Sequence, residues 1–475
     1  MDMENFEKLR PVGRMERYST SRHDLRFYLG PAVTASYKLP QKCSLPLKDY
    51  VYQACEDVIA QHPILSAIPV DEQTQSPHFI RLPKVDLDKC VTLTSRKHKF
   101  PWGTEARDAE LEELLSSQHS IPYEAPNSFW RLCILSNTDH FAAAFFYHHA
   151  LGDGRSGMAF HRTFQQALSR AITANNGSSV QALVPSPTTP LLPTIESLHP
   201  LPLTIWHIIK VLFKQKVWSW RDSGLWTGAK CAVPLGQTQV RNVAFPASAT
   251  ITFKNLCRDN GTTITAALQT LIAGVLFSHL PSNYTSLNCS GALSMRQWLP
   301  PDAGITDDVM GVWIQELSET YNRTSFPADA NSKTDPNLLP WPEAQRSRRT
   351  IEHSLSLKGT NSVIGLLRYV NNYHEELFLP KIGKERSSSF EVSNLGLFKP
   401  ATATIGDEDN AEIGRMMFTQ SAGVMSAAIQ FSVVTGADGC LVLGVTWQEG
   451  IVEEVLVEKV TESVRAEIGR LTGTN

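Results

Sequence analysis

The amino-acid sequence predicts an α/β (α+β) protein of two lobes, each a mixed β-sheet with helices packed on it. The chain has 475 residues, more than one hydrophobic core usually supports, so two lobes are expected. It is 42% hydrophobic and 19% charged, which is typical of a globular protein, and helical and strand patterns alternate along it. We expect an N-terminal lobe at 1–185, a linker with a crossover helix at 186–245, and a C-terminal lobe at 246–475.

In the N-terminal lobe, hydrophobic spacing predicts a helix, four short strands and a second helix. Apolar residues recur at helical spacing in Lys48–His62, and Pro63 ends that pattern. The predicted strands are Ile64–Ile68, His78–Leu82, Leu132–Leu135 and Phe141–Tyr147. Turn-forming residues at 137–139 join the last two strands as a hairpin. The final strand is apolar throughout, which indicates burial on both faces, and after 148–154 an amphipathic helix follows, with its apolar stripe at 160–172.

The second half of the chain repeats this alternation after a polar, proline-rich linker from Asn175 to Pro202. The predicted elements are a helix at Thr262–Leu280, strands at Ser286–Met295, Met416–Gln420, Ala427–Thr435 and Cys440–Trp447, and a last helix from 452 to 471. A tight turn at 436–439 joins the last two strands. Ser325–Pro342 contains four prolines and is predicted to be a surface loop.

Charge, targeting signals and cysteine usage limit the partners. The formal net charge of -3 gives no electrostatic reason to expect nucleic acid or an anionic membrane as the main partner. The N-terminus has neither the basic flank nor the apolar run of a secretory signal, so we expect a cytoplasmic protein. The eight cysteines are scattered and form no C-x-x-C pair, which argues against a zinc site and against a disulfide scaffold.

The longest apolar stretch, Leu201–Trp220, is interrupted by Lys210, Lys214 and Lys216. A charged side chain is costly at the centre of a bilayer, so no transmembrane segment is expected. We expect this tryptophan-rich stretch to form a helix that packs against the body of the protein. Peripheral attachment of the helix to an intracellular membrane is the alternative.

The residues that can carry chemistry gather in His148-His149-Ala150-Leu151-Gly152-Asp153-Gly154, directly after the buried strand. Histidine can be neutral near pH 7 and still accept a proton, as a general base must. Adjacent strand residues point to opposite faces, so one histidine should face a pocket and the other the packing, and both cannot bind one metal ion. Asp153 can brace the turn, and the flanking glycines, including Gly154, allow close approach of the backbone.

The histidines could instead be ordinary side chains at the end of a strand or in a core, and a lone histidine would favour that interpretation. Here the strand, the pair, the spacing and the glycines occur together, which favours a functional site. The residues alone leave open which of the two histidines faces the reaction.

The pattern His-His-x-x-x-Asp-Gly resembles the signature of the thioester-dependent acyltransferase superfamily. This superfamily includes chloramphenicol acetyltransferase, peptide-synthetase condensation domains, plant acyltransferases and fungal alcohol acetyltransferases. The chain is most similar to the fungal alcohol acetyltransferases, and the similarity extends over nearly its whole length. Besides the histidine motif, it is carried by weaker motifs in the family's order: Arg14–Tyr28, Gln61–Ser66, Leu225–Gly228, Gly291–Pro301, Ser393–Gly396 and Phe418–Gln420.

This resemblance implies two lobes related by a pseudo-twofold axis, with a tunnel between them and His149 midway along it as general base. It implies a structural role for Asp153, paired with an arginine of the second lobe. Arg296 is the candidate because Ser294–Pro300 occupies the matching place; a solvated strand-end arginine is the alternative. The plant branch's D-F-G-W-G motif is absent. Ser393 or Asn394, in the corresponding region, could donate a hydrogen bond near the oxyanion or the donor, although a plain tight turn is favoured.

The resulting hypothesis is an acyl-CoA-dependent O-acyltransferase that moves an acetyl group from acetyl-CoA to a hydroxyl of a small alcohol or secondary metabolite. His149 takes the hydroxyl proton, transfer is direct, and neither a metal nor a bound cofactor is expected. One alternative is a condensation or product-release enzyme that forms a C–O or C–N bond and takes its acyl group from an acyl carrier protein. A second alternative is a non-catalytic or cyclase-like relative. We expect a monomer.

Overall fold

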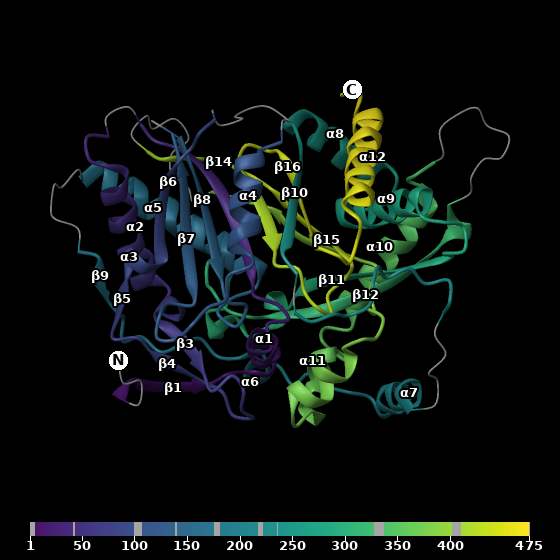
Figure 1. Ribbon diagram of the computed structural model, residues 1–475, viewed down its shortest axis with the longest axis horizontal. Helices are drawn as coiled ribbons and strands as arrows, with labels where there is room; N and C mark the ends of the chain where they lie inside the picture. Colours follow the sequence, from purple (N-terminus) through teal and green to yellow (C-terminus); the bar gives the residue numbers. More distant parts are fainter. Residues whose placement is uncertain are drawn as a thin grey trace.

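The computed structural model describes residues 5–40, 43–98, 107–137, 140–174, 181–216, 222–234, 236–326, 337–400 and 410–474. Parts of three expected connections lie outside these ranges: the hairpin turn at 138–139, the start of the linker at 175–180, and 327–336 of the proline-rich loop. The described residues form two lobes side by side, each with one large mixed sheet and helices packed on it, as predicted (Figure 1).

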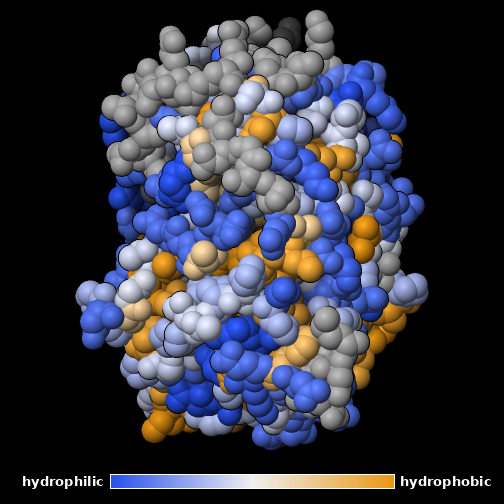
Figure 2. All heavy atoms as spheres, turned by 90° about the vertical axis from the view of Figure 1, so that its left-hand side faces the viewer, coloured by the Kyte–Doolittle hydropathy of each residue, from blue (hydrophilic) through white to orange (hydrophobic). Residues whose placement is uncertain are grey.

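The N-terminal lobe is a five-stranded sheet with two long helices on one face. Its strands in spatial order are β14 (Glu412–Gln420), β2 (Pro31–Lys38), β8 (His140–Tyr147), β7 (Trp130–Ser136) and β6 (Val91–Ser95). Helices α2 (Leu47–Gln61) and α5 (Gly154–Ala174) pack together over it around a large apolar cluster. The rings of Phe145 and Phe160 stack in that cluster with their centres 3.7 Å apart. The outer surface of this lobe is largely polar, with apolar side chains in separate groups (Figure 2).

Smaller elements complete the first lobe. One small sheet contains β1 (Glu7–Pro11), β4 (His78–Arg81) and β3 (Ala67–Val70), and another contains β5 (Lys84–Asp86) and β9 (Leu183–Pro185). Helix α3 (Leu87–Cys90) precedes β6, and α1 (Arg14–Asp24) lies at the boundary with the second lobe. The strand expected at Ile64–Ile68 begins later than predicted, at Ala67. Residues Pro63–Ser66 form a 3₁₀ turn instead, because proline at a first helical position has the backbone angle that such a turn needs.

The C-terminal lobe is a six-stranded sheet with an apolar face and a polar face. Its strands in order are β10 (Thr238–Phe245), β16 (Leu441–Gln448), β15 (Ile429–Thr435), β13 (Phe390–Leu397), β11 (Ser286–Ser294) and β12 (Ile314–Asn322). The apolar face packs on α8 (Ala247–Asp259), α9 (Ile264–His279) and α12 (Glu454–Thr472), and α10 (Trp341–Ser356) packs against α9. The predicted hairpin joins β15 to β16, and Gly439 adopts a φ of +77° in its turn.

The C-terminal half of the chain contributes one strand to the first lobe's sheet. The expected C-terminal lobe at 246–475 contains β14, yet β14 pairs antiparallel with β2 in the first lobe's sheet. This pairing gives the edge of β2 a partner and leaves its backbone groups satisfied. On the far face of the same sheet, Ala142 and Phe146 of β8 meet Val240 and Val442 of the second lobe, beside α4 (Ala109–Gln118). Strand β8 is therefore buried on both faces, as its apolar sequence predicts.

Helix α7 (Ile205–Lys216) lies at the edge of the molecule, near α11 (Val363–Leu366) (Figure 1). The short helix α6 (Ile195–Leu198) precedes it in the chain. The outward side chains of α7, Trp206 among them at 81% exposure, are large and apolar. His207, Ile208 and Val211 are half-buried, so one face of the helix packs against the body as expected, while the opposite face is exposed. At the beginning of the helix, the Thr204 N–H donates to Oδ1 of Asn361 at 2.8 Å.

Among the described residues, no single helix is both long and apolar enough to cross a membrane. Helices α8 and α9 meet that criterion only as a pair, and they are bent by 95° relative to each other.

Candidate active site

Strand β8 delivers the histidine pair to the boundary between the lobes. It ends at Tyr147, and the N–H of His148 donates to the carbonyl of Phe129 at 2.9 Å. The chain then turns, and α5 begins at Gly154. A Cβ atom at Gly154 would lie 2.5 Å from Cδ2 of Leu395 in the other lobe. Glycine at this position therefore allows the two lobes to approach closely.

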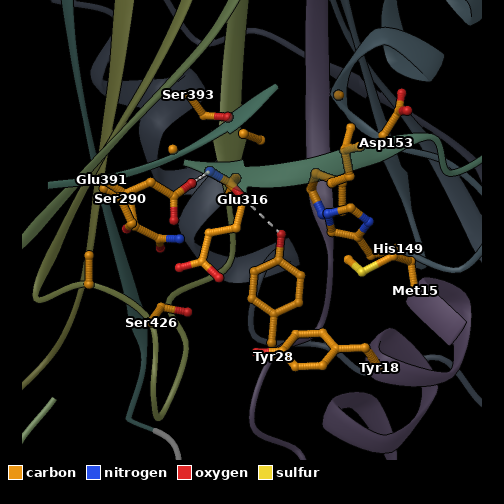
Figure 3. A pocket seen from close by; sticks show the side chains of 18 of the residues that line it. Met15, Tyr18, Tyr28, His149, Asp153, Ser290, Glu316, Glu391, Ser393 and Ser426 are labelled. Atoms are coloured by element: carbon orange, nitrogen blue, oxygen red, sulfur yellow. Dashed lines mark hydrogen bonds between the residues drawn. The ribbon is translucent and has the colours of Figure 1, made fainter. Parts of the chain in front are cut away.

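A cavity of about 290 Å³ lies between the lobes beside this turn. Its walls come from α1, from the turn after β8 and from the polar face of the six-stranded sheet. Figure 3 shows His149 and Tyr28 on one side of the cavity and Glu316 and Glu391 on the other. Four more of the residues singled out from the sequence line it: Asp153, Gly154, Ser393 and Asn394.

His149 faces this cavity, with the centre of its ring 5.8 Å from that of Tyr28. Burial, followed by the positive charge of Arg22, lowers the pKa of His149 to about 4. An interaction with its own main chain only partly offsets these two effects. Nδ1 is buried without a well-formed hydrogen bond, which leaves Nε2 as the accessible ring nitrogen. The imidazole is therefore neutral near pH 7 and can accept a proton.

His148 lies away from the cavity, in a cluster with His23 and Glu72. It is 1% exposed, and its Nδ1 accepts the N–H of Ala150 at 3.0 Å. Its Nε2 lies 3.2 Å from Oε1 of Glu72, close but poorly aligned for a hydrogen bond. Burial lowers the pKa of His148 to about 4. Burial opposes ionisation of Glu72 as well, but its contacts with His148 and His23 outweigh this and lower its pKa to about 2.

This cluster is the one group in the described part of the chain that brings three possible metal ligands within 4.8 Å of one another. Nε2 of His23 accepts the N–H of Tyr123 at 3.1 Å, so the ring proton is on Nδ1, 2.8 Å from Glu72. Nδ1 of His148 also accepts a backbone N–H, which assigns the proton of that neutral ring to Nε2. Neither ring keeps a free lone pair for a metal ion. The cluster fits a support for the turn better than it fits a metal site.

The structure joins Asp153 to Arg296 across the boundary between the lobes. Nη1 and Nη2 of Arg296 donate to Oδ2 and Oδ1 of Asp153 at 2.7 and 3.0 Å, a bidentate arrangement. Asp153 is 0% exposed and Arg296 is 8% exposed. Burial would raise the pKa of Asp153, but the charge and hydrogen bonds of Arg296 outweigh it and lower that pKa overall. The carboxyl of Asp153 is therefore ionised near neutral pH.

Further donors and acceptors complete the surroundings of this pair. The N–H of Trp313 donates to Oδ2 of Asp153 at 3.1 Å, and the N–H of Ser156 donates to Oδ1 at 3.2 Å. Nε of Arg296 donates to the carbonyl of Thr306 at 3.2 Å, and its guanidinium lies 5.0 Å from the centre of the Trp313 ring. A buried ion pair is tolerated when its remaining polar groups are satisfied in this way. The pair thus fixes the turn after β8 to the end of β11.

Ser393 and Asn394 lie in β13, which is a strand with an irregular pairing, and not in the tight turn expected there. Nδ2 of Asn394 donates to Thr265 at 2.9 Å, and its Oδ1 accepts the N–H of Gly396 at 2.8 Å. The amide of Asn394 is thus engaged within its own lobe. The Ser393 side chain points toward the cavity and can reach a ligand (Figure 3).

Sequence reasoning missed five residues of this region: Arg22, Tyr28, Glu72, Glu316 and Glu391. Arg22 and Tyr28 belong to a segment that carried the resemblance, but nothing in it marked them as lining a cavity. Glu316 and Glu391 lie on strands that alternate polar and apolar residues, a pattern that a solvent-facing sheet produces equally well. Glu72 follows a short strand and reaches the histidine motif only through tertiary contacts.

Comparison with known proteins decides the family. The family model described as alcohol acetyltransferase matches residues 11–462. The chain belongs to the alcohol acetyltransferase family. It is therefore an enzyme, an O-acyltransferase, and its sequence resemblance to this family is confirmed.

Relatives of this alcohol acetyltransferase are found among fungi. A probable alcohol acetyltransferase, crmB, of Aspergillus fumigatus is 33% identical over 466 residues, covering 95% of this chain and 97% of that protein. A probable alcohol acetyltransferase, FCK4, of Fusarium pseudograminearum is 22% identical, covering 96% and 94%. Among solved structures, TRI3 trichothecene 15-O-acetyltransferase from Fusarium sporotrichioides shares the fold, with a TM-score of 0.71 at 15% identity and coverage of 98% and 94%.

A condensation domain shares the fold as well. The first condensation domain of the calcium-dependent antibiotic synthetase superposes with a TM-score of 0.62 at 12% identity, covering 99% of this chain and 98% of that domain. The two-lobed architecture expected from the resemblance is thus confirmed for this chain.

The contribution of the Asp153–Arg296 pair can be measured by a double-mutant cycle. We expect Asp153→Ala and Arg296→Ala each to lower the free energy of unfolding by about 3–5 kcal/mol, because each leaves a buried charge without its partner. The double variant should lose clearly less than the sum of the two. Urea unfolding followed by tryptophan fluorescence measures all three.

Arg348→Ala is the matched control, because Arg348 pairs with Glu352 at 2.7 Å but on the surface. It should cost only about 0–1 kcal/mol. Additive losses in the double variant would show that Asp153 and Arg296 do not stabilise the protein as a pair.

Proposed function

We propose that this alcohol acetyltransferase moves an acetyl group from acetyl-CoA to a hydroxyl of a small alcohol or secondary metabolite, as a monomer, with His149 as general base. The observation that carries the proposal is a partly buried imidazole facing a cavity between two lobes, where burial keeps its pKa low and the ring neutral near pH 7. A general base needs a group that is unprotonated at working pH and within reach of the reacting proton. The family and its fungal relatives fit a role in secondary metabolism.

In the proposed reaction, Nε2 of His149 takes the proton as the acceptor hydroxyl oxygen attacks the thioester carbonyl carbon. The C–S bond breaks when the tetrahedral intermediate collapses, and the leaving thiolate receives the proton from the imidazolium. The products are the acetate ester and free coenzyme A, and no metal ion or bound cofactor takes part. Ser393 is our candidate for a hydrogen bond to the oxyanion, because it lines the same cavity. Asp153 and Arg296 act by positioning the turn that carries His149.

Two alternative functions would give different results in the activity measurements described below. An acyl carrier protein could deliver the acyl group, in keeping with the fold shared with condensation domains. A non-catalytic or cyclase-like role would need neither donor, but it would leave unexplained a neutral histidine and a braced turn at the cavity.

Activity measurements with the two donors test the proposal. Purified enzyme with a small alcohol should release coenzyme A from acetyl-CoA, and His149→Ala should lower kcat/KM about 10²–10⁴-fold while the protein stays folded. His148→Ala should clearly lower the unfolding temperature but reduce kcat/KM less than His149→Ala does, because His148 is packed against His23 and Glu72. Turnover with an acetylated carrier protein but not with acetyl-CoA would show that the donor is a carrier protein. Full activity of His149→Ala would show that His149 is not the general base.

The fall of kcat/KM at low pH, the acid limb of the pH profile, reports the pKa of His149, if His149 is the general base. Protonation abolishes its role as base, so activity is present above its pKa and lost as pH falls through it. Because the pKa of His149 is lowered to about 4, kcat/KM should stay level from pH 7 downward and fall only near that value. Arg22→Gln removes a positive charge beside the ring and should move the limb upward. A limb near 6.5 in the wild type, about the unperturbed value, would contradict the buried environment.

We further propose that the protein works in the cytoplasm and that α7 attaches it to an intracellular membrane surface. The exposed side chains Ile205, Trp206, Ile209, Leu212 and Phe213 recur on one face of this helix, with the exposed Lys210 among them. Tryptophan and aliphatic residues on one face with lysine at the margin suit a helix that lies in the interface of an anionic membrane.

Co-sedimentation with vesicles of mixed neutral and anionic lipid tests this attachment. Trp206→Ser combined with Phe213→Ser should reduce the bound fraction several-fold, because it removes two of the largest apolar side chains from the exposed face. The control Val455→Ser removes an exposed apolar side chain from α12, and it should bind like the wild type. Equal binding of all three proteins, or no binding by the wild type, would contradict the proposal.

A further inference from the structure

The cavity has a second wall, which the transfer chemistry itself does not use. Opposite His149, the six-stranded sheet presents Ser290, Glu316 and Glu391 (Figure 3), and Gln430 of the same sheet also lines the cavity. Strand pairing places them on one face, with Ser290 opposite Glu391 and Glu391 opposite Gln430. The other face of the same strands packs apolar side chains against the helices. The polar face of this sheet is therefore turned inward, onto the cavity.

Hydrogen bonds hold Glu391 in one orientation. Nε2 of Gln420 donates to its Oε1 at 2.8 Å, and Oε1 of Gln420 accepts the hydroxyl of Tyr28 at 3.1 Å. Burial raises the pKa of Glu391, and hydrogen bonds from Gln420 and Gln430 offset this only in part. The chain of contacts continues to His149, whose ring lies beside that of Tyr28. The position of this carboxyl is thus defined relative to the proposed general base.

Glu316, by contrast, makes no hydrogen bond and no ion pair with any residue that the structure describes, while it lines the cavity. Glu316 is exposed to solvent; partial desolvation in the cavity, and then the charge of Glu391, raise its pKa, whereas Lys381 and Arg22 act in the opposite direction. A ligand that displaces water from this carboxyl must supply hydrogen-bond donors in its place. The oxygens of Glu316 are therefore open to a ligand in the cavity.

The cavity is also lined by three cationic residues, Arg22, Arg155 and Lys381. Cζ of Arg22 lies 4.6 Å from the centre of the Tyr18 ring and 4.3 Å from that of Tyr28, and its Nε has no hydrogen-bond partner. Three acidic residues, Asp153, Glu316 and Glu391, balance these three cations and leave no excess charge that would select an ion of either sign. The wall suits a neutral ligand that carries several hydrogen-bond donors and acceptors, which describes a molecule with many hydroxyl groups.

We propose that Glu316 and Glu391 form an acceptor-recognition site that selects a polyhydroxylated alcohol and holds one of its hydroxyls toward His149. This inference rests on the proposed acetyl transfer and specifies its acceptor class. Hydroxyl groups donate to the two carboxyls, and Arg22 can donate to an acceptor oxygen. An alcohol without extra hydroxyls displaces water from these polar groups without replacing its hydrogen bonds, and that penalty is what discriminates against it.

A series of acceptors with one carbon skeleton tests this selection: 1-hexanol, 1,6-hexanediol, 1,2,6-hexanetriol and 6-amino-1-hexanol, each with acetyl-CoA. For the wild type, kcat/KM should rise from the monool to the triol by at least about tenfold, and the amino alcohol should gain no comparable advantage. Glu316→Gln and Glu391→Gln should each lower the triol-to-monool ratio by about fivefold or more. Glu449→Gln is the matched control, because Glu449 is exposed outside the cavity, and it should leave the ratio unchanged.

Three results would overturn the assignment: an unchanged ratio in both glutamine variants, an equal loss on every acceptor, or a preference for the amino alcohol. Thermal unfolding checks that each variant folds. If Glu391→Gln does not fold, Glu316→Gln carries the test, because Glu316 has no hydrogen bond to lose within the described structure.

Binding measured without a donor separates this inference from the proposed reaction. If the wild type acetylates none of the four alcohols, acetyl transfer to this class fails, and calorimetric titration of the triol then tests the site alone. Weaker triol binding in both glutamine variants than in Glu449→Gln supports the recognition site. Equal binding in all proteins, or no binding to the wild type, overturns it.

Discussion

The turn that carries His148 and His149 depends on one buried ion pair. Asp153 and Arg296 come from different lobes, and their bidentate contact at 2.7 and 3.0 Å crosses the boundary on which the cavity lies. Removing two charges from water is expensive, so such a pair adds little net stability over a well-packed apolar contact. It does impose geometry, because any other placement of the lobes leaves a buried charge unpaired. The pair therefore determines where the turn after β8, and with it His149, meets the second lobe.

Burial around this turn controls the histidines in two different ways. His148 and His149 both have pKa values lowered to about 4, and burial is the largest cause for each. For His148 the neutral ring serves packing, since its Nδ1 accepts a backbone N–H and its Nε2 faces Glu72. For His149 the same neutrality leaves a basic nitrogen facing the cavity. One strand end thus supplies a support and a candidate base, because neighbouring residues point to opposite sides.

The sequence predicts the parts of this molecule that are local in the chain. The two-lobed α/β class, the buried strand β8 and the histidine motif at its end all follow from periodicity and spacing within short windows. Strand β14 shows the limit, because its apolar sequence predicts a strand but not that it pairs with β2 some 380 residues away. Glu72 and Glu391 show the same limit for the candidate site. Only tertiary contacts bring Glu72 to the histidine motif and Glu391 to the cavity. For helix α7, periodicity predicts an apolar face but not whether another element covers it, and the structure leaves that face exposed.

The distribution of these residues separates chemistry from recognition. The groups proposed for proton transfer lie in one continuous turn, which a strand, a glycine contact and an ion pair hold in place. The groups proposed for recognition are spread over neighbouring strands of the other lobe, on a sheet face that the fold keeps next to the cavity. A substitution on that face changes one side chain without disturbing the turn, because backbone pairing and the helix-covered face hold the strands. The acceptor preference can therefore change between relatives while the reaction stays the same, and a family name defines the chemistry more closely than the substrate.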